Sequence, residues 1–175
     1  QCEDSETKTK QRAIAQGWDE NLPVYWLDKF KLSELPELIE LAKEIEPRLI
    51  VLDTLSRIRD DNATESSAEM GRILEPLQEF AKNHNCCVLP IHHTGKIKAD
   101  NADTLDVFDT IRGSSSIRAT CRGTLVIAYG ESGYRLCIEN GYNKQDLKVS
   151  LNLADLTWKL LGKWGMQADA SQSDQ

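Results

Sequence analysis

The sequence lacks the long apolar segments and paired cysteines that mark membrane and secreted proteins. No stretch of its 175 residues approaches the roughly 20 apolar residues of a membrane span, and no signal peptide is visible. The 5 cysteines include no CxxC pair. Cys86, Cys87, Cys121 and Cys137 lie in apolar runs, which favours reduced core residues over a disulfide or zinc framework. We therefore expect a cytoplasmic protein with no membrane partner.

The chain also lacks an excess of basic residues. Its formal net charge is −7, which argues against broad, nonspecific binding of nucleic acid over the whole surface but leaves room for a local basic loop. With 28% charged and 40% hydrophobic residues, the composition is that of a globular domain. We expect one domain over residues 1–164 and a disordered polar tail over 165–175. Because the chain begins with Gln1 rather than Met, we expect a fragment.

Apolar runs alternate with amphipathic segments through most of the chain. The spacing of apolar residues predicts helices over 5–16, 33–45 and 65–84, the last with a kink at Pro76, and strands over 24–27, 49–52, 86–91 and 123–129. Short antiparallel strands are expected over 134–139, 147–153 and 156–160. This order predicts an α/β fold: a three-layer, mostly parallel sheet with a C-terminal antiparallel β extension.

The run Leu49-Ile50-Val51-Leu52 ends abruptly in a carboxylate, Asp53. Four consecutive apolar residues are typical of a strand that is buried on both faces, as in a parallel sheet. Ligands of such sheets bind beyond the carboxyl ends of the strands. Asp53 is therefore either a magnesium ligand or a residue that caps the following loop, and the residues alone favour neither.

One further polar group follows a predicted strand, and another lies at the start of the chain. His92-His93, with Thr94 beyond them, end the run at 86–91, and Glu3-Asp4 lie at the start of the chain. A carboxylate for magnesium, a second one to orient water and a polar group that senses phosphate make a phosphoryl-transfer site. The alternatives are a solvated histidine pair and a polar chain start. A metal held by both histidines and Asp53 is disfavoured, because adjacent strand residues point to opposite faces.

The segment 49–123 resembles the RecA-like ATPases of the hexameric replicative helicase and plasmid RepA type. LIVLDTLSRI is similar to their Walker B strand, and VLPIHHTGK is similar to their third motif. RGSSSIRATCRGTLVIAYG resembles the RGSSA-type segment before their next strand. ENGYNKQDLKVSLNLADLTWKL resembles their closing hairpin, which carries a finger residue that reaches a neighbour's ATP. The resemblance implies a RecA-like fold, ATP and Mg²⁺ as cofactors, a hexameric ring and DNA, single-stranded, as a partner.

The resemblance also assigns roles to residues. Asp53 would bind magnesium through water, and Glu3, or alternatively Asp4, would polarise the attacking water. His93 or His92 would sense the γ-phosphate.

Further residues would act between subunits or on DNA. Arg112 or Arg118 would contact a neighbour's nucleotide or DNA. Tyr142 and Asn143 fall near the finger position, and Lys144 follows them. The loop 97–111 lies where relatives place a DNA-facing loop. This loop and its preceding residue carry two lysines and four aspartates, namely Lys96, Lys98, Asp100, Asp103, Asp106 and Asp109.

The phosphate-binding motif of this family, GxxxxGK[ST], occurs nowhere in the sequence. The two Gly-Lys pairs are Gly95-Lys96 and Gly162-Lys163. In the family the motif follows a central strand that lies between the strands corresponding to 86–91 and 123–129. We therefore expect the central P-loop strand to be missing and the chain alone not to bind ATP. The alternatives are a degenerate, non-catalytic module for assembly or DNA binding, and a metal-dependent hydrolase.

Overall fold

The computed structural model describes residues 6–19, 21–27, 29–59, 67–95, 105–111 and 115–165. The chain divides into two compact units. The first comprises Gln1–Gly95 and Asp109–Cys121, and the second comprises Lys96–Phe108 and Arg122–Gln175. The predicted tail lies outside the described residues except for residue 165. The fold is mixed α/β, with a small parallel sheet in the first unit and a four-stranded antiparallel sheet in the second.

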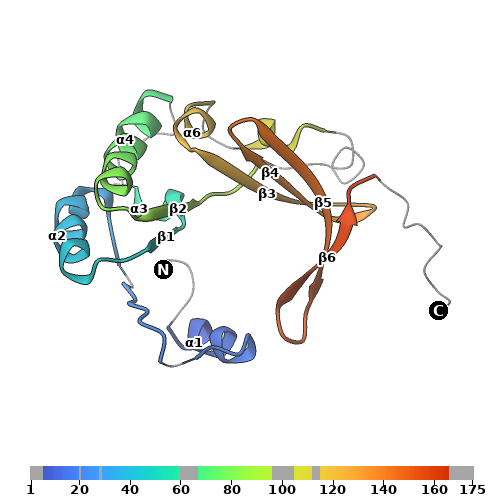
Figure 1. The fold of residues 1–175 in the computed structure, drawn as a ribbon, viewed down its shortest axis with the longest axis horizontal. Coiled ribbons are helices and arrows are strands. Elements are labelled where there is room, and N and C mark those ends of the chain that lie inside the picture. The colour runs from blue at the N-terminus through green and yellow to red at the C-terminus, as the bar shows by residue number, and fades with distance from the viewer. Residues whose placement is uncertain are drawn as a thin grey trace. The chain divides into compact units, whose positions relative to one another are not determined.

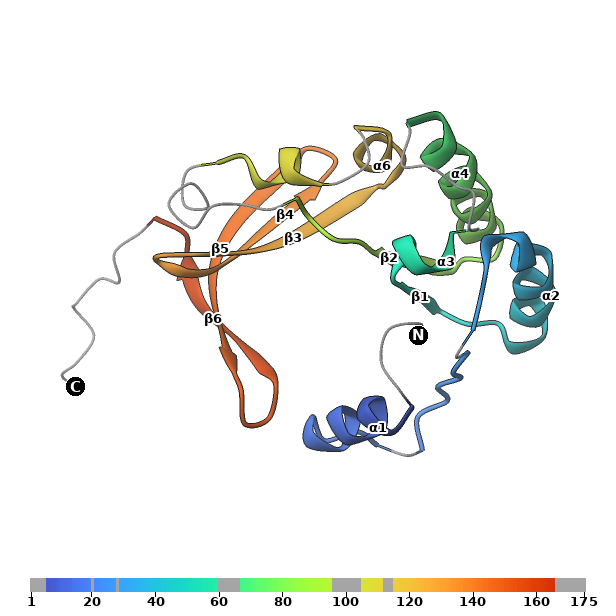
Figure 2. The same cartoon turned by 180° about the vertical axis from the view of Figure 1, so that it is seen from behind.

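The first unit is built on two parallel strands at the predicted apolar runs. Strand β1 (Leu49–Asp53) pairs with β2 (Cys87–Ile91) in a register that runs from Leu49 opposite Cys87 to Asp53 opposite Ile91. Helices α2 (Leu35–Ile45) and α4 (Ser67–Asn83) lie on one side of the two strands in both views (Figures 1 and 2). The crossover between the strands thus contains a helix, as parallel pairing requires.

Sequence signals account for the boundaries of these helices. A short 3-10 helix, η1 (Leu32–Glu34), precedes α2, and the backbone N–H of Lys31 donates to Glu34 Oε2 at 2.7 Å. A proline in the first turn of α2 needs no hydrogen-bond acceptor there, and Glu46 ends the helix with φ 51°. Helix α4 continues through Pro76 to residue 83.

The core of the first unit lies between these helices and the inner face of β1 and β2. The chain turns directly after β1 into α3 (Leu55–Ile58), which places Leu55 in full burial. Helix α4 contributes apolar residues at helical spacing, and α6 (Ser115–Thr120) adds one more. The buried members of this cluster are Phe30, Leu35, Leu52, Leu55, Ile58, Met70, Leu74, Leu77 and Ile117.

The outer face of β1 and β2 is exposed, contrary to the expectation of burial on both faces. Leu49, Val51, Leu89 and Ile91 are all solvent-exposed. Helices α2 and α4 both cover the opposite face, and no helix of the described part of the unit covers this one. The uninterrupted apolar run correctly predicted a strand, but only one face of that strand is covered by helices of the described part of the unit.

The second unit is a meander of four antiparallel strands. Its order is β3 (Gly123–Gly130), β4 (Gly133–Asn140), β5 (Asn143–Asn152) and β6 (Thr157–Lys163). The predicted antiparallel extension is confirmed, although β5 begins at residue 143 rather than 147. Gly133 and Gly141 lie at the first two turns with positive φ, where a side chain would be strained. Strand β3 pairs with β4 over its whole length, whereas the sequence suggested that it continues the parallel sheet.

The N-terminal part matches the prediction only in its helix. Helix α1 (Glu6–Ala15) forms where expected. The expected strand at 24–27 does not form, and Val24, Tyr25, Trp26 and Leu27 are exposed. A strand needs a partner for its backbone hydrogen bonds, and no described strand pairs with this segment. None of the helices in the described ranges is long and apolar enough to cross a membrane.

The core predicts that replacing two leucines of the first unit by alanine will lower the free energy of unfolding by very different amounts. Leu55 is 0% exposed, whereas Leu49 is 52% exposed. Leu55→Ala should lower the free energy of unfolding by about 2–5 kcal/mol, because it leaves a cavity. The matched change Leu49→Ala should lower it by less than about 1 kcal/mol. Urea unfolding followed by circular dichroism measures both values, and equal losses would contradict this core.

Candidate functional site

The carboxyl ends of β1 and β2 lie at one edge of the small sheet, and two of the predicted polar groups, Asp53 and the histidine pair, lie there. Asp53 is the last residue of β1 and lies opposite Ile91, the last residue of β2. His92 and His93 follow directly. Asp53 and His92 are partly buried, whereas His93 is exposed. The register therefore places one carboxylate and the start of the histidine pair at the same end of the small sheet.

Contacts on both strands hold this edge in place. After β1, Thr54 is buried, its hydroxyl lies 2.9 Å from Ser56 Oγ, and its carbonyl accepts the N–H of Arg57 at 2.9 Å. After β2, Thr94 forms an antiparallel bridge with Ile111. The N–H of the next residue, at position 95, donates to the carbonyl of residue 110 at 2.6 Å. The histidine pair therefore lies in a segment that is fixed at both ends.

The described residues at this edge, among them Asp53, do not form a complete metal site. Within the described residues, no group of three or more His, Cys, Asp or Glu side chains could hold a metal ion. This finding counts against a hydrolase that binds its metal through Asp53, His92 and His93. It is compatible with a magnesium ion, which commonly takes one or two protein carboxylates and completes its shell with water and phosphate oxygens.

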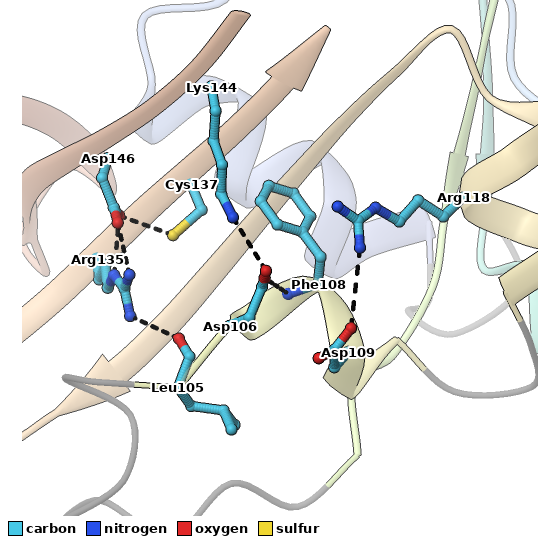
Figure 3. Close-up of polar contacts among 9 residues, drawn as sticks. All are labelled: Leu105, Asp106, Phe108, Asp109, Arg118, Arg135, Cys137, Lys144 and Asp146. Carbon is cyan, nitrogen blue, oxygen red and sulfur yellow. Dashed lines mark hydrogen bonds and ion pairs between the residues drawn. The ribbon is translucent and has the colours of Figure 1, made fainter. Parts of the chain in front are cut away.

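Arg118 lies on α6, which is anchored to the first unit. Its Nη1 lies 3.8 Å from Asp109 Oδ1, a long ion pair between partly exposed groups (Figure 3). Ile117 beside it belongs to the buried core, and Gln78 Nε2 on α4 donates to the carbonyl of Thr120 at 3.2 Å. The helix is thus fixed, while the guanidinium of Arg118 stays at the surface.

Several predicted residues lie outside the described part of the chain. These are Glu3 and Asp4, Arg112, and the lysines of the loop at Lys96 and Lys98. Their predicted roles therefore stay predictions.

Asn143 and Lys144 begin β5 in the second unit, and Lys144 contacts the segment before β3. Its Nζ lies 3.0 Å from Asp106 Oδ2 and 5.0 Å from the centroid of the Phe108 ring (Figure 3). The other oxygen of Asp106 accepts the backbone N–H of Phe108 at 3.1 Å. Asn143 is exposed and pairs with Asn140 across the turn. The proposed finger lysine therefore already has an intramolecular partner.

The second unit also contains a polar cluster that the sequence did not reveal. Arg135 on β4 is only 9% exposed, and its Nε donates to Asp146 Oδ1 on β5 at 2.8 Å, while Nη2 donates to Oδ2. Its Nη1 donates to the carbonyl of Leu105 at 3.0 Å (Figure 3). Strand alternation places Arg135 and Asp146 on one face, but it does not show which charges pair.

Cys137 completes this cluster as a donor. Its Sγ donates to Asp146 Oδ1 at 2.8 Å. Burial, together with this hydrogen bond, raises the pKa of Cys137 to about 12. The hydrogen bonds from Arg135 lower the pKa of Asp146. At neutral pH the thiol is therefore protonated and the carboxylate is ionised, which is a structural arrangement and not that of a reactive cysteine.

Comparison with known proteins assigns the N-terminal part of the chain to a family. A family model described as an AAA domain matches residues 1–99, more than half of the chain. The chain belongs to this family. None of the curated proteins matched the chain. The AAA domain match identifies an ATPase-type domain and is consistent with ATP and Mg²⁺ as ligands of the family. It contains Asp53 and the histidine pair, whereas Arg118 and Lys144 lie beyond it.

The polar cluster predicts a loss of stability in acid. Because the pKa of Asp146 is lowered in the folded state, its contribution is complete above the unfolded value of about 3.9 and is lost as the pH falls through the lower, folded value. Asp146→Asn should cost about 1–3 kcal/mol at pH 7, since Arg135 loses its charged partner. The variant should also show a weaker acid dependence of urea unfolding.

The control is the more exposed ion pair of the same unit. Asp106→Asn removes a partner of Lys144 whose side chain is 48% exposed, so it should cost at most about 1 kcal/mol. Equal losses of unfolding free energy for Asp106→Asn and Asp146→Asn would contradict the view that Asp146, as the partner of Arg135, contributes more to stability than Asp106.

The cysteines should differ strongly in reactivity toward a thiol reagent. Cys87 is exposed, whereas Cys137 is buried with a pKa of about 12. Because the thiolate is the reactive form, Cys137 should react at least about 1,000-fold more slowly than Cys87 at pH 8 in the folded protein. Site-resolved mass spectrometry measures both rates. Comparable rates in urea and a large difference without urea are expected.

Proposed function

We propose that this chain is part of a RecA-like ATPase of the replicative helicase or RepA type. The observation that carries the proposal is the register of β1 and β2, which brings Asp53 and the histidine pair to one edge of a parallel sheet within the AAA domain match. This is where open α/β sheets bind ligands. The core of the proposed ATPase spans residues 1–164, followed by a polar tail over 165–175, and we propose a cytoplasmic location.

The proposed roles follow the chemistry of phosphoryl transfer. ATP with Mg²⁺ supplies the phosphoanhydride bond and the charge neutralisation that its cleavage needs. Asp53 orients water molecules on the magnesium side of the site. Glu3, or Asp4, accepts a proton from the attacking water, and His93 or His92 donates a hydrogen bond toward the γ-phosphate. Each role needs a side chain at the carboxyl end of a strand, and Asp53 meets this condition.

The phosphate-binding loop is proposed to come from sequence outside these 175 residues. The open sheet edges support this. Among the described strands, β2 pairs only with β1, and β3 pairs only with β4, so each keeps one edge without a partner. Strand β3 is uncharged over its whole length, which is typical of an interior strand rather than of an edge. The chain alone should therefore lack ATP-binding capacity.

The parent protein is proposed to act as a hexameric ring on single-stranded DNA. Arg112 or Arg118 and Asn143 or Lys144 would reach the nucleotide of a neighbouring subunit, with the loop 97–111 toward DNA. For Lys144 this role requires that its ion pair with Asp106 opens. The second candidate is a non-catalytic module for assembly or DNA binding. A GxxxxGK[ST] motif in the longer parent protein would decide for the ATPase over this candidate.

A nucleotide titration tests the proposal on the chain itself. Isothermal calorimetry with ATP and Mg²⁺ should show no binding in the micromolar range, because the phosphate cradle is absent from the sequence. Micromolar affinity would overturn this expectation.

The catalytic proposal is tested in the longer parent protein. Asp53→Asn should lower its ATP hydrolysis rate by about 100-fold or more, since the magnesium side of the site loses its charge. Asp155→Asn, which changes an exposed turn between β5 and β6, is the control and should leave the rate unchanged. A parent protein with no ATPase activity would favour the non-catalytic module.

A further inference from the structure

Positive charge is distributed unequally between the two faces of the antiparallel sheet in the second unit. We call the face that carries more of it the basic face. Strand alternation and the pairing register place four cations there, namely Arg135, Lys144, Lys148 and Lys159. The basic face also carries two carboxylates, Glu139 and Asp146, whereas Lys163 is the one charged residue of β3–β6 on the other face. In a chain of net charge −7, the basic face is the part of this sheet that suits an anion.

The four cations form two groups along the strands. Lys144 lies next to the turn between β4 and β5, and its partner is Asp106. The other three lie toward the opposite end of the sheet, where Lys148 is directly opposite Arg135 in the register. Lys159 lies one strand further on, diagonally from Lys148. We call Arg135, Lys148 and Lys159 the cation row, because they cross β4, β5 and β6.

Asp146 balances only one charge of the cation row. Both of its oxygens accept hydrogen bonds from Arg135, which is only 9% exposed (Figure 3). Like charges directly opposite each other destabilise a sheet, and this contact neutralises the arginine of the opposed pair. Among the described residues, neither Lys148 nor Lys159 has an ion-pair partner. The row therefore keeps an excess of two positive charges.

Solvent reaches both lysines of the row. Lys148 is partly buried and Lys159 is exposed. The carboxylates in the turns at this end of the sheet, Glu131 and Asp155, do not come within ion-pair distance of either lysine. The Cα atoms of diagonal residues on adjacent strands lie about 7–8 Å apart. Two ammonium groups on flexible stems at this spacing can contact neighbouring phosphates of one extended strand.

We propose that the cation row binds the phosphate backbone of single-stranded nucleic acid through Lys148 and Lys159. Lysine contacts to phosphate supply the sequence-independent part of such binding. The same face holds the segment from Leu105 to Phe108, through hydrogen bonds and an ion pair from Arg135 and Lys144. This segment belongs to the loop 97–111, which we proposed to face DNA. The inference rests on the proposed function for its partner class and adds the residues that contact the backbone.

The test measures binding of the complete 175-residue chain to a fluorescently labelled oligo(dT) by anisotropy at several salt concentrations. Each phosphate of a single strand that a lysine neutralises contributes about 0.7 to the slope of log K against log salt concentration. Lys148→Gln and Lys159→Gln should therefore each reduce the slope by about 0.7, and the double variant by about 1.4. Each single variant should also weaken binding several-fold at low salt.

Lys163 on the other face of the sheet provides the matched control. Lys163→Gln removes the same charge from an exposed residue of β6 and changes the net charge of the chain equally. It should leave both the affinity and the slope unchanged. Lys148→Arg keeps the charge at the row and should keep the slope. Circular dichroism of each variant checks that it is folded.

A second measurement distinguishes a nucleic-acid backbone from the phosphates of a nucleotide. ATP with Mg²⁺ and inorganic tripolyphosphate are added as competitors to the complex with oligo(dT). Neither should displace the oligonucleotide more effectively than a simple salt at the same ionic strength. Specific displacement by both compounds, or tighter binding of duplex DNA than of oligo(dT), would overturn the proposal.

Two further outcomes would also overturn it. These are no binding of oligo(dT) to the chain, and equal slopes for Lys148→Gln, Lys159→Gln and Lys163→Gln. In the second case the chain would still bind DNA, so the proposed partner class would stand while the cation row would not. No step requires ATP hydrolysis, so the result is independent of the test of Asp53 in the parent protein.

Discussion

The parallel pairing of β1 and β2 is the constraint on which the candidate site depends. Its register brings the end of one apolar run, Asp53, level with the end of another, Ile91, although the two lie far apart in sequence. A shift by one residue would turn Leu52 out of the core and Asp53 toward it. Burial of Leu52 and Leu55 on either side of the carboxylate therefore stabilises its position at the sheet edge.

The sequence predicts local elements well because their causes are local. Apolar runs give β1 and β2 to within a residue, and helical spacing gives α2 and α4. It predicts the edge that carries Asp53, because parallel strands end together. It does not predict which strands lack neighbours. The segment 24–27 has the composition of a strand and remains unpaired, and β3 pairs only within the antiparallel sheet.

Long-range polar contacts are the part of the structure that sequence patterns miss. Alternation in β4 and β5 predicts that Arg135, Cys137 and Asp146 share a face, but several carboxylates are available to Arg135 in such a chain. The structure shows which carboxylate is used: Arg135 donates two hydrogen bonds to Asp146 and a third to the carbonyl of Leu105. Because Lys144 contacts Asp106, which follows Leu105, one cation of β4 and one of β5 hold the same segment.

The uncharged edge of β3 has a practical consequence for the protein in solution. Its eight residues contain no charge and no proline, and among the described strands the edge has no neighbour. The other edge strand, β6, carries Lys159 and Lys163, which discourage the addition of a further strand. Aggregation of the isolated chain should therefore begin at β3, through edge-to-edge pairing between molecules.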